Sequence, residues 1–73
     1  MAKVPNIEDI KSCNRADVYL KDAPEKPVIV QGKFIQVSDD ELDLVIKTDN
    51  QYAVFKSRDV LAFHFYRWAV GGI

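Results

Sequence analysis

Histidine and cysteine, the side chains that most often bind zinc or pair as nucleophile and base, are scarce in this sequence. The chain has one histidine, His64, and one cysteine, Cys13, so it lacks the ligands of a common zinc site and cannot form an internal disulfide. His64 lies in an apolar run with no Ser, Cys or Asp at a supporting spacing, and Cys13 shares an apolar stripe with Ile7 and Ile10. We interpret both as structural residues. The sequence therefore predicts a protein that is not an enzyme, with no cofactor and no small-molecule substrate.

Acidic residues gather in one short segment, at Asp39, Asp40, Glu41 and Asp43. Carboxylates suit calcium or magnesium, but the glycine and the ligand spacing of an EF-hand loop are missing. We interpret the segment as a solvated turn without a metal. The ten Lys and Arg residues are spread evenly and the net charge is −1, so nucleic-acid binding would depend on local clustering.

No segment reaches the roughly 18 apolar residues of a membrane span, and the N-terminus lacks the apolar core of a signal peptide. A single cysteine is also typical of a reducing compartment. We therefore predict a cytoplasmic protein without a membrane partner.

Two periodicities predict the elements that position these residues. Asn6 can cap a short α-helix that carries the stripe of Ile7, Ile10 and Cys13. Alternation of apolar and polar residues then predicts β-strands at 17–21, 28–37, 42–47, 51–56 and 60–66, and the proline-containing segment 22–27 reads as a turn. The prediction is a mainly β, single-domain chain: an N-terminal helix within 1–15, a five-stranded antiparallel small barrel within 16–66, and a tail at 67–73.

The second predicted strand changes face around Gly32. Its apolar residues occupy even positions as far as Phe34 and odd positions, Ile35 and Val37, beyond it. Such a change at a glycine is typical of a bulge or sharp bend. A strongly bent strand among five short ones fits a small closed or nearly closed barrel.

The last predicted strand, 60–66, is apolar on both faces, and four of the eight aromatic residues lie between Phe63 and Trp68. A core in a chain of 73 residues contributes about 3–5 kcal/mol, and 48% of these residues are hydrophobic. The composition offers neither a disulfide nor a common zinc site, so we expect contact with further subunits to provide additional stability. The predicted subunit interface consists of Val54, Leu61, Phe63, Phe65, Tyr66 and Trp68.

A helix followed by five strands, with a glycine bend in the second, resembles the Sm-like fold, which is one kind of SH3-like barrel. The segment 32–46 resembles the family's first motif with one extra residue at the turn, and 54–63 resembles its second motif. The resemblance implies a homo-oligomeric ring in which the fourth strand of one subunit pairs with the fifth of the next. Rings of five to seven subunits need only small differences in the angle between subunits.

The resemblance also implies an RNA site at the centre of the ring, at the positions of Asp43, Lys56 and Arg58. The family keeps an asparagine where this chain has Asp43, and a stacking side chain where it has Glu41 or Leu42. A carboxylate cannot donate a hydrogen bond as an amide does, and it repels phosphate. We therefore expect the acidic turn to form ion pairs with Lys56 and Arg58 in place of the usual uridine site.

Two functions stay open on this basis. The first is a homo-oligomeric ring that binds RNA at the pore or on another face, with Tyr19, Tyr52 and Lys33 as candidates. The second is an oligomeric scaffold or protein-interaction module without affinity for nucleic acid. The composition of the acidic turn favours the second, and Lys56 with Arg58 favours the first.

Overall fold

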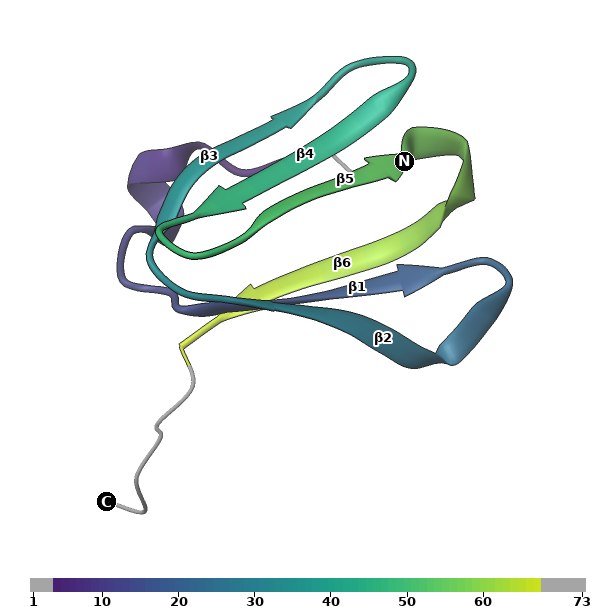
Figure 1. The fold of residues 1–73 in the computed structure, drawn as a ribbon, viewed down its shortest axis with the longest axis horizontal. Coiled ribbons are helices and arrows are strands. Elements are labelled where there is room, and N and C mark those ends of the chain that lie inside the picture. The colour runs from purple at the N-terminus through teal and green to yellow at the C-terminus, as the bar shows by residue number, and fades with distance from the viewer. Residues whose placement is uncertain (1–3, 68–73) are drawn as a thin grey trace.

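The computed structural model describes residues 4–67, which form two three-stranded antiparallel sheets that enclose one apolar core (Figure 1). The first sheet has the order β2-β1-β6 and comprises β1 (Arg15–Leu20), β2 (Ala23–Gln31) and β6 (Val60–Tyr66). The second has the order β3-β4-β5 and comprises β3 (Phe34–Asp39), β4 (Asp43–Thr48) and β5 (Tyr52–Lys56). Two short 3₁₀ turns complete the elements: η1 (Ile7–Ile10) and η2 (Ser57–Asp59).

The mainly β prediction is confirmed, but the strands do not form a closed five-stranded barrel. The predicted strand 28–37 occurs as two strands, β2 and β3, on either side of Gly32. Gly32 has φ +127°, a backbone conformation that side chains with a Cβ rarely adopt, and the chain passes there from one sheet to the other (Figure 1). At the opposite side, β5 and β6 are not hydrogen-bonded to each other. The result is six strands in two sheets.

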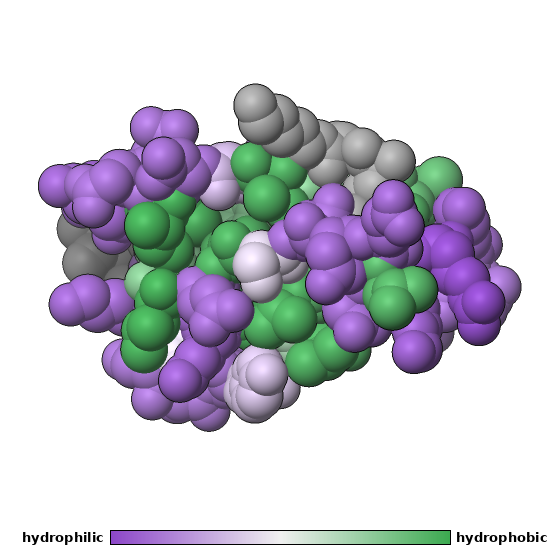
Figure 2. Space-filling view, turned by 90° about the horizontal axis from the view of Figure 1, so that it is seen from above, coloured by the Kyte–Doolittle hydropathy of each residue, from purple (hydrophilic) through white to green (hydrophobic). Residues whose placement is uncertain are grey.

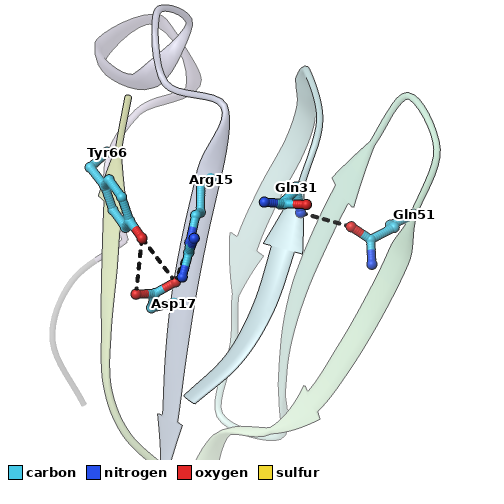
Figure 3. Close-up of polar contacts among 5 residues, drawn as sticks. All are labelled: Arg15, Asp17, Gln31, Gln51 and Tyr66. Atoms are coloured by element: carbon cyan, nitrogen blue, oxygen red, sulfur yellow. Dashed lines mark hydrogen bonds and ion pairs between the residues drawn. The ribbon is translucent and has the colours of Figure 1, made fainter. Parts of the chain in front are cut away.

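The turn between β4 and β5 clamps the bend at Gly32. The hydroxyl of Thr48 donates to the carbonyl of Gln31 (3.1 Å), and the backbone N–H of Gln31 donates to the side-chain oxygen of Gln51 (2.7 Å; Figure 3). These bonds satisfy backbone groups that the interrupted ladder leaves unpaired. The clamp thereby joins β2 of the first sheet to the β4–β5 turn of the second.

The prediction of a turn over 22–27 is wrong. The chain reverses at Lys21 and Asp22, and β2 begins immediately at Ala23, so that Pro24 and Pro27 lie within a strand. β2 is an edge strand, and there a proline costs little because an outward-facing N–H has no partner in the ladder. Opposite this part of β1, β2 contains more residues than β1, and the pairing therefore shifts register between Val18 and Leu20.

The predicted N-terminal α-helix is also wrong, because the segment forms only the four-residue turn η1. Its cap is as predicted: the Asn6 side chain accepts from the N–H of Glu8 (3.0 Å). Only Ile10 of this turn is buried, so a longer helix would gain little packing. Instead the N–H of Asn14 donates to the carbonyl of Tyr66 (3.2 Å), which draws the chain directly into the first sheet.

The core lies between the sheets and is centred on their middle strands. Ala16 and Val18 of β1 and Leu44 and Ile46 of β4 are fully buried. The alternation over 42–47 predicts that Leu42, Leu44 and Ile46 share the inner face of a half-buried strand. Leu44 and Ile46 do so, but Leu42 precedes β4 and is 71% exposed. The remaining buried apolar residues come from the neighbouring elements: Ile10, Val30, Phe34 and Val60.

Candidate assembly interface and polar site

Two of the four outer strands have protected edges. β2 carries two prolines and the charged pair Glu25 and Lys26, features that discourage pairing with another chain. β3 is contacted by η1. By contrast, β5 and β6 contain no proline, and Lys56 is the single Lys, Arg, Asp or Glu in the two strands. The strands without protection are therefore β5 and β6.

The core is also least covered along these two strands. The residues of β5 that pair with Leu44 and Ile46 are Phe55 and Ala53, so they face the core, yet both are only partly buried. Phe63 and Phe65 of β6 are likewise partly buried against the core. Along β5 and β6, the two sheets therefore leave their core-facing aromatic side chains partly exposed.

The predicted interface residues fall into three groups. Val54 and Leu61 are 53% and 54% exposed. Phe63 and Phe65 are in edge-to-face contact, with ring centroids 5.7 Å apart, and Phe65 also contacts Phe34 at 5.2 Å. These two therefore combine a core role with partial exposure. Tyr66 is partly buried in polar contacts, and Trp68 lies outside the described residues.

Apolar side chains are also exposed on the second sheet. Figure 2, the view from the side of β3 and β4, has apolar side chains at its centre between hydrophilic ends. The exposed large apolar residues of this sheet include Ile35 of β3 and Val54 of β5. Val54 pairs with Val45 of β4, so these two valines lie on the face turned away from the core. The apolar surface of β5 thus continues onto its neighbour.

The acidic turn between β3 and β4 is an ordered structure. The Asp40 carboxylate accepts from the N–H groups of Asp43 and Leu42, both at 2.7 Å, and these bonds lower the pKa of Asp40 below its usual 3.8. The Ser57 hydroxyl donates to Asp39 Oδ1 (2.8 Å), and the Ser57 N–H donates to the carbonyl of Leu42 (2.8 Å). The turn is therefore fastened to η2.

The three residues that the resemblance assigns to RNA lie close to this turn. Asp43 and Lys56 are cross-strand partners, and Lys56 Nζ lies 4.0 Å from Asp43 Oδ1. Their side chains are 39% and 64% exposed, so this pair contributes at most about 1 kcal/mol. Arg58 lines a shallow polar pocket together with Lys21 and the acidic turn. The expected ion pair is present for Lys56, and Arg58 makes none within residues 4–67.

The mixed charge of this pocket limits its chemistry. Its lining holds two cations, Lys21 and Arg58, beside three acidic residues of the turn, so it does not form an anion cradle. No group of three or more His, Cys, Asp or Glu side chains within 4–67 is placed to hold a metal ion. Ser57 donates to a carboxylate rather than to a histidine base, which is not the arrangement of an activated nucleophile.

A polar cluster on the first sheet escaped the sequence interpretation. Asp17 accepts from Arg15 Nε (2.9 Å) and from the Tyr66 hydroxyl (3.2 Å), and the Arg15 guanidinium lies over the Tyr66 ring, 5.3 Å from its centroid (Figure 3). Desolvation, together with the neighbouring Asp17 carboxylate, raises the pKa of Tyr66 above 10.0. Arg15 and Asp17 lie two positions apart and so share a strand face, but nothing local indicates Tyr66 as their partner.

Comparison of the chain with protein-family models, curated proteins and solved structures gives no match in any of the three. The resemblance to Sm-like proteins therefore rests on the two sequence motifs and the glycine bend alone. Within the described residues, the helical segments are too short to cross a membrane.

The Asp40 turn makes a prediction for acid conditions. The folded-state pKa of Asp40 is depressed, so its ionised form stabilises the fold above pH 3.8, and that contribution is lost as the pH falls through the lower folded value. We expect Asp40→Asn, which keeps a side-chain acceptor but cannot titrate, to lose less stability than wild type between pH 5 and about 2. Urea unfolding at several pH values measures this. Glu41→Gln is the matched control, because it neutralises a neighbouring acid. If its stability fell with pH by the same amount as that of Asp40→Asn, the effect would come from the overall charge and not from the Asp40 turn.

Proposed function

We propose that this protein is a homo-oligomeric small-barrel protein of the Sm-like kind, whose subunits join through β5 of one copy and β6 of the next. The observation that carries the proposal is the coincidence of unprotected strand edges and incomplete core cover on the same two strands. A neighbouring strand on each would pair the free backbone groups and bury Val54 and Leu61. Buried apolar area of this kind is the main source of association free energy.

Two different edges that meet give a head-to-tail contact. Such a contact forms a closed ring when the rotation between subunits closes, and an open filament when it does not. The resemblance to Sm-like proteins favours the ring, with five to seven copies. The clamp at the Gly32 bend joins the two sheets that would carry the two contacts, which favours one constant rotation between copies.

The mass of the full chain in solution tests the proposal. Size-exclusion chromatography with light scattering at micromolar concentration should give five to seven times the subunit mass of 8.3 kDa. Native mass spectrometry then gives the number of copies. A monomer at these concentrations would reject the ring, and a mass that grows continuously with concentration would indicate a filament.

RNA binding is the second candidate function, favoured by one observation on the second sheet. Tyr52 is 71% exposed and pairs across the sheet with Lys47, which is also exposed. An exposed ring beside a cation can stack on a base while the cation approaches phosphate, and stacking contributes about 1–3 kcal/mol per base. The pore position has weaker support, because Asp43 already lies beside Lys56.

Fluorescence anisotropy with labelled oligo-U and oligo-A separates these sites. We expect salt-sensitive binding with a dissociation constant below about 10 µM if RNA is a ligand, since non-specific binding is typically 10⁻⁴–10⁻⁶ M. Lys47→Gln and Lys56→Gln are matched changes at exposed lysines. A larger loss in Lys47→Gln would place RNA on the sheet, and a larger loss in Lys56→Gln would place it at the pore. Absence of binding would leave the scaffold function.

A further inference from the structure

The sequence of β6 specifies its own register poorly. Its residues V-L-A-F-H-F-Y are apolar at most positions on both faces, so a slide along β1 would still bring apolar groups to the core. In the structure Phe65 pairs with Ala16 and Phe63 with Val18. A slide by two residues that places Phe63 opposite Ala16 also places Leu61 opposite Val18, so both core-facing pairs stay apolar. Register is weakly fixed when the apolar pattern does not distinguish the alternatives.

The cluster of Arg15, Asp17 and Tyr66 is the feature of the β1–β6 contact that does distinguish them. Arg15 and Tyr66 are direct cross-strand partners, whereas Asp17 pairs with His64 and receives the Tyr66 hydroxyl diagonally. The side chains of Arg15 and Asp17 are only 16% and 12% exposed. A carboxylate covered to this degree is costly to the fold unless its hydrogen-bond partners are in place.

We propose that Asp17, with Arg15 and Tyr66, is a register lock for β6. This slide carries Tyr66 past Arg15 and away from Asp17, and it leaves the covered carboxylate without the phenol as a donor. It also removes the Tyr66 ring from the Arg15 guanidinium. The apolar contacts of the strand tolerate the slide, and the polar contacts do not. The cluster therefore selects the observed pairing over one that the core would also accept.

The lock has a consequence for assembly, and that consequence rests on the proposed function. The register of β6 decides where Leu61 and the unpaired backbone groups of the strand lie relative to the edge of the next subunit. A subunit with β6 out of register would present a displaced edge, which would alter the rotation between copies. The lock itself acts within one chain and does not depend on assembly.

Tyr66→Phe tests the lock, because it removes the hydroxyl and keeps the ring over Arg15. Residue-resolved amide exchange and cross-strand nuclear Overhauser effects report the register. We expect the amides of Ala62 and His64, which face β1, to exchange about tenfold faster, with a second set of β1–β6 contacts displaced by two residues. The amides of Leu44 and Ile46, in the middle of the other sheet, should change much less. Tyr52→Phe, which removes the hydroxyl of an exposed tyrosine on the other sheet, is the matched control.

Asp17→Asn is a second variant, which keeps the shape and one acceptor oxygen, and we expect it to give a smaller effect of the same kind. The lock would be overturned if amide exchange became equally faster in β4 and β6 while the β1–β6 contacts stayed in a single, unshifted set. The cluster would then be an ordinary stabilising contact. These measurements read pairing inside one chain, so they decide the lock whether the protein is a ring or a monomer. A monomeric mass of the wild-type protein would reject the ring, and displaced contacts in Tyr66→Phe would still support the lock.

Discussion

Replacing Gly32 with alanine is expected to remove most of the free energy of unfolding at 25 °C. A Cβ at this position would lie 2.6 Å from Asp49 Oδ1, 2.8 Å from Asn50 Oδ1 and 2.9 Å from Thr48 Oγ1. These atoms cannot withdraw freely, because the Asp49 oxygen accepts from the Lys33 N–H (3.1 Å) and the Thr48 hydroxyl donates to the Gln31 carbonyl. Relief of the clash therefore breaks the clamp that holds the bend.

The expected size follows from two contributions. A residue with a Cβ at φ near +127° is strained by about 1–3 kcal/mol, and each lost hydrogen bond of the clamp costs about 1 kcal/mol. The sum of roughly 3–4 kcal/mol approaches the whole stability of about 3–5 kcal/mol that a core of this size contributes. Association with other copies would offset part of this loss by mass action.

Urea unfolding followed by circular dichroism measures the effect at several protein concentrations. Lys33→Ala is the control, because it changes the exposed neighbour of Gly32 and leaves its backbone bond to Asp49 intact. We expect that variant to stay within about 0.5 kcal/mol of wild type. A Gly32→Ala protein with a midpoint near that of Lys33→Ala would mean that the bend can take another conformation.

The bend was predictable because its signal is local, whereas its clamp was not. The change of face at Gly32 is visible within a few residues of sequence. The bonds that hold the bend join residues 16–20 positions apart, and their side chains are ordinary turn residues such as Thr48 and Asp49. Sequence patterns report which face a residue occupies, and they do not report which distant turn lies over it.

The two wrong elements failed for a related reason. Prolines and charges at 22–27 are good local evidence of a turn, but an edge position in a sheet tolerates them, and edge position is a property of the whole fold. The capping signal at Asn6 was correct, yet the length of the helix was decided by the pairing of Asn14 with Tyr66. In both cases contacts between sheet strands overrode local preference.

In the candidate sites, too, local contacts were predictable and long-range contacts were not. Asp43 and Lys56 were expected to face one another, because the motif resemblance places them on adjacent strands, and they are cross-strand partners. The contact between Asp17 and Tyr66 spans 49 positions and follows no motif, so only the fold reveals it. The apolar character of the last strand can be read from its own residues. The structure adds that Phe63 and Phe65 of this strand are only partly buried.

Val54→Lys is expected to dissociate the assembly while leaving the subunit folded. Val54 lies on β5, the strand proposed to pair with β6 of the next copy, and its side chain is 53% exposed in the single subunit. A lysine there remains in water within one subunit, and exposed substitutions usually change stability by no more than about 0.5 kcal/mol. In the assembly the same charge would be carried into an apolar contact, and lysine on a strand edge is a common means of preventing pairing.

The affinity between subunits should fall at least a hundredfold, which corresponds to about 2.8 kcal/mol per contact. Sedimentation equilibrium over a range of concentrations measures this, and circular dichroism verifies the fold. Ile29→Lys provides the matched control: Ile29 is 42% exposed on β2, whose edge already carries prolines. We expect the Ile29 variant to retain the wild-type mass. If Ile29→Lys dissociated the assembly and Val54→Lys did not, the contact would lie on the opposite side of the subunit. If both kept the wild-type mass, neither strand would carry the contact, and the partial exposure of Phe55 and Phe63 would have to be stable in water without a partner.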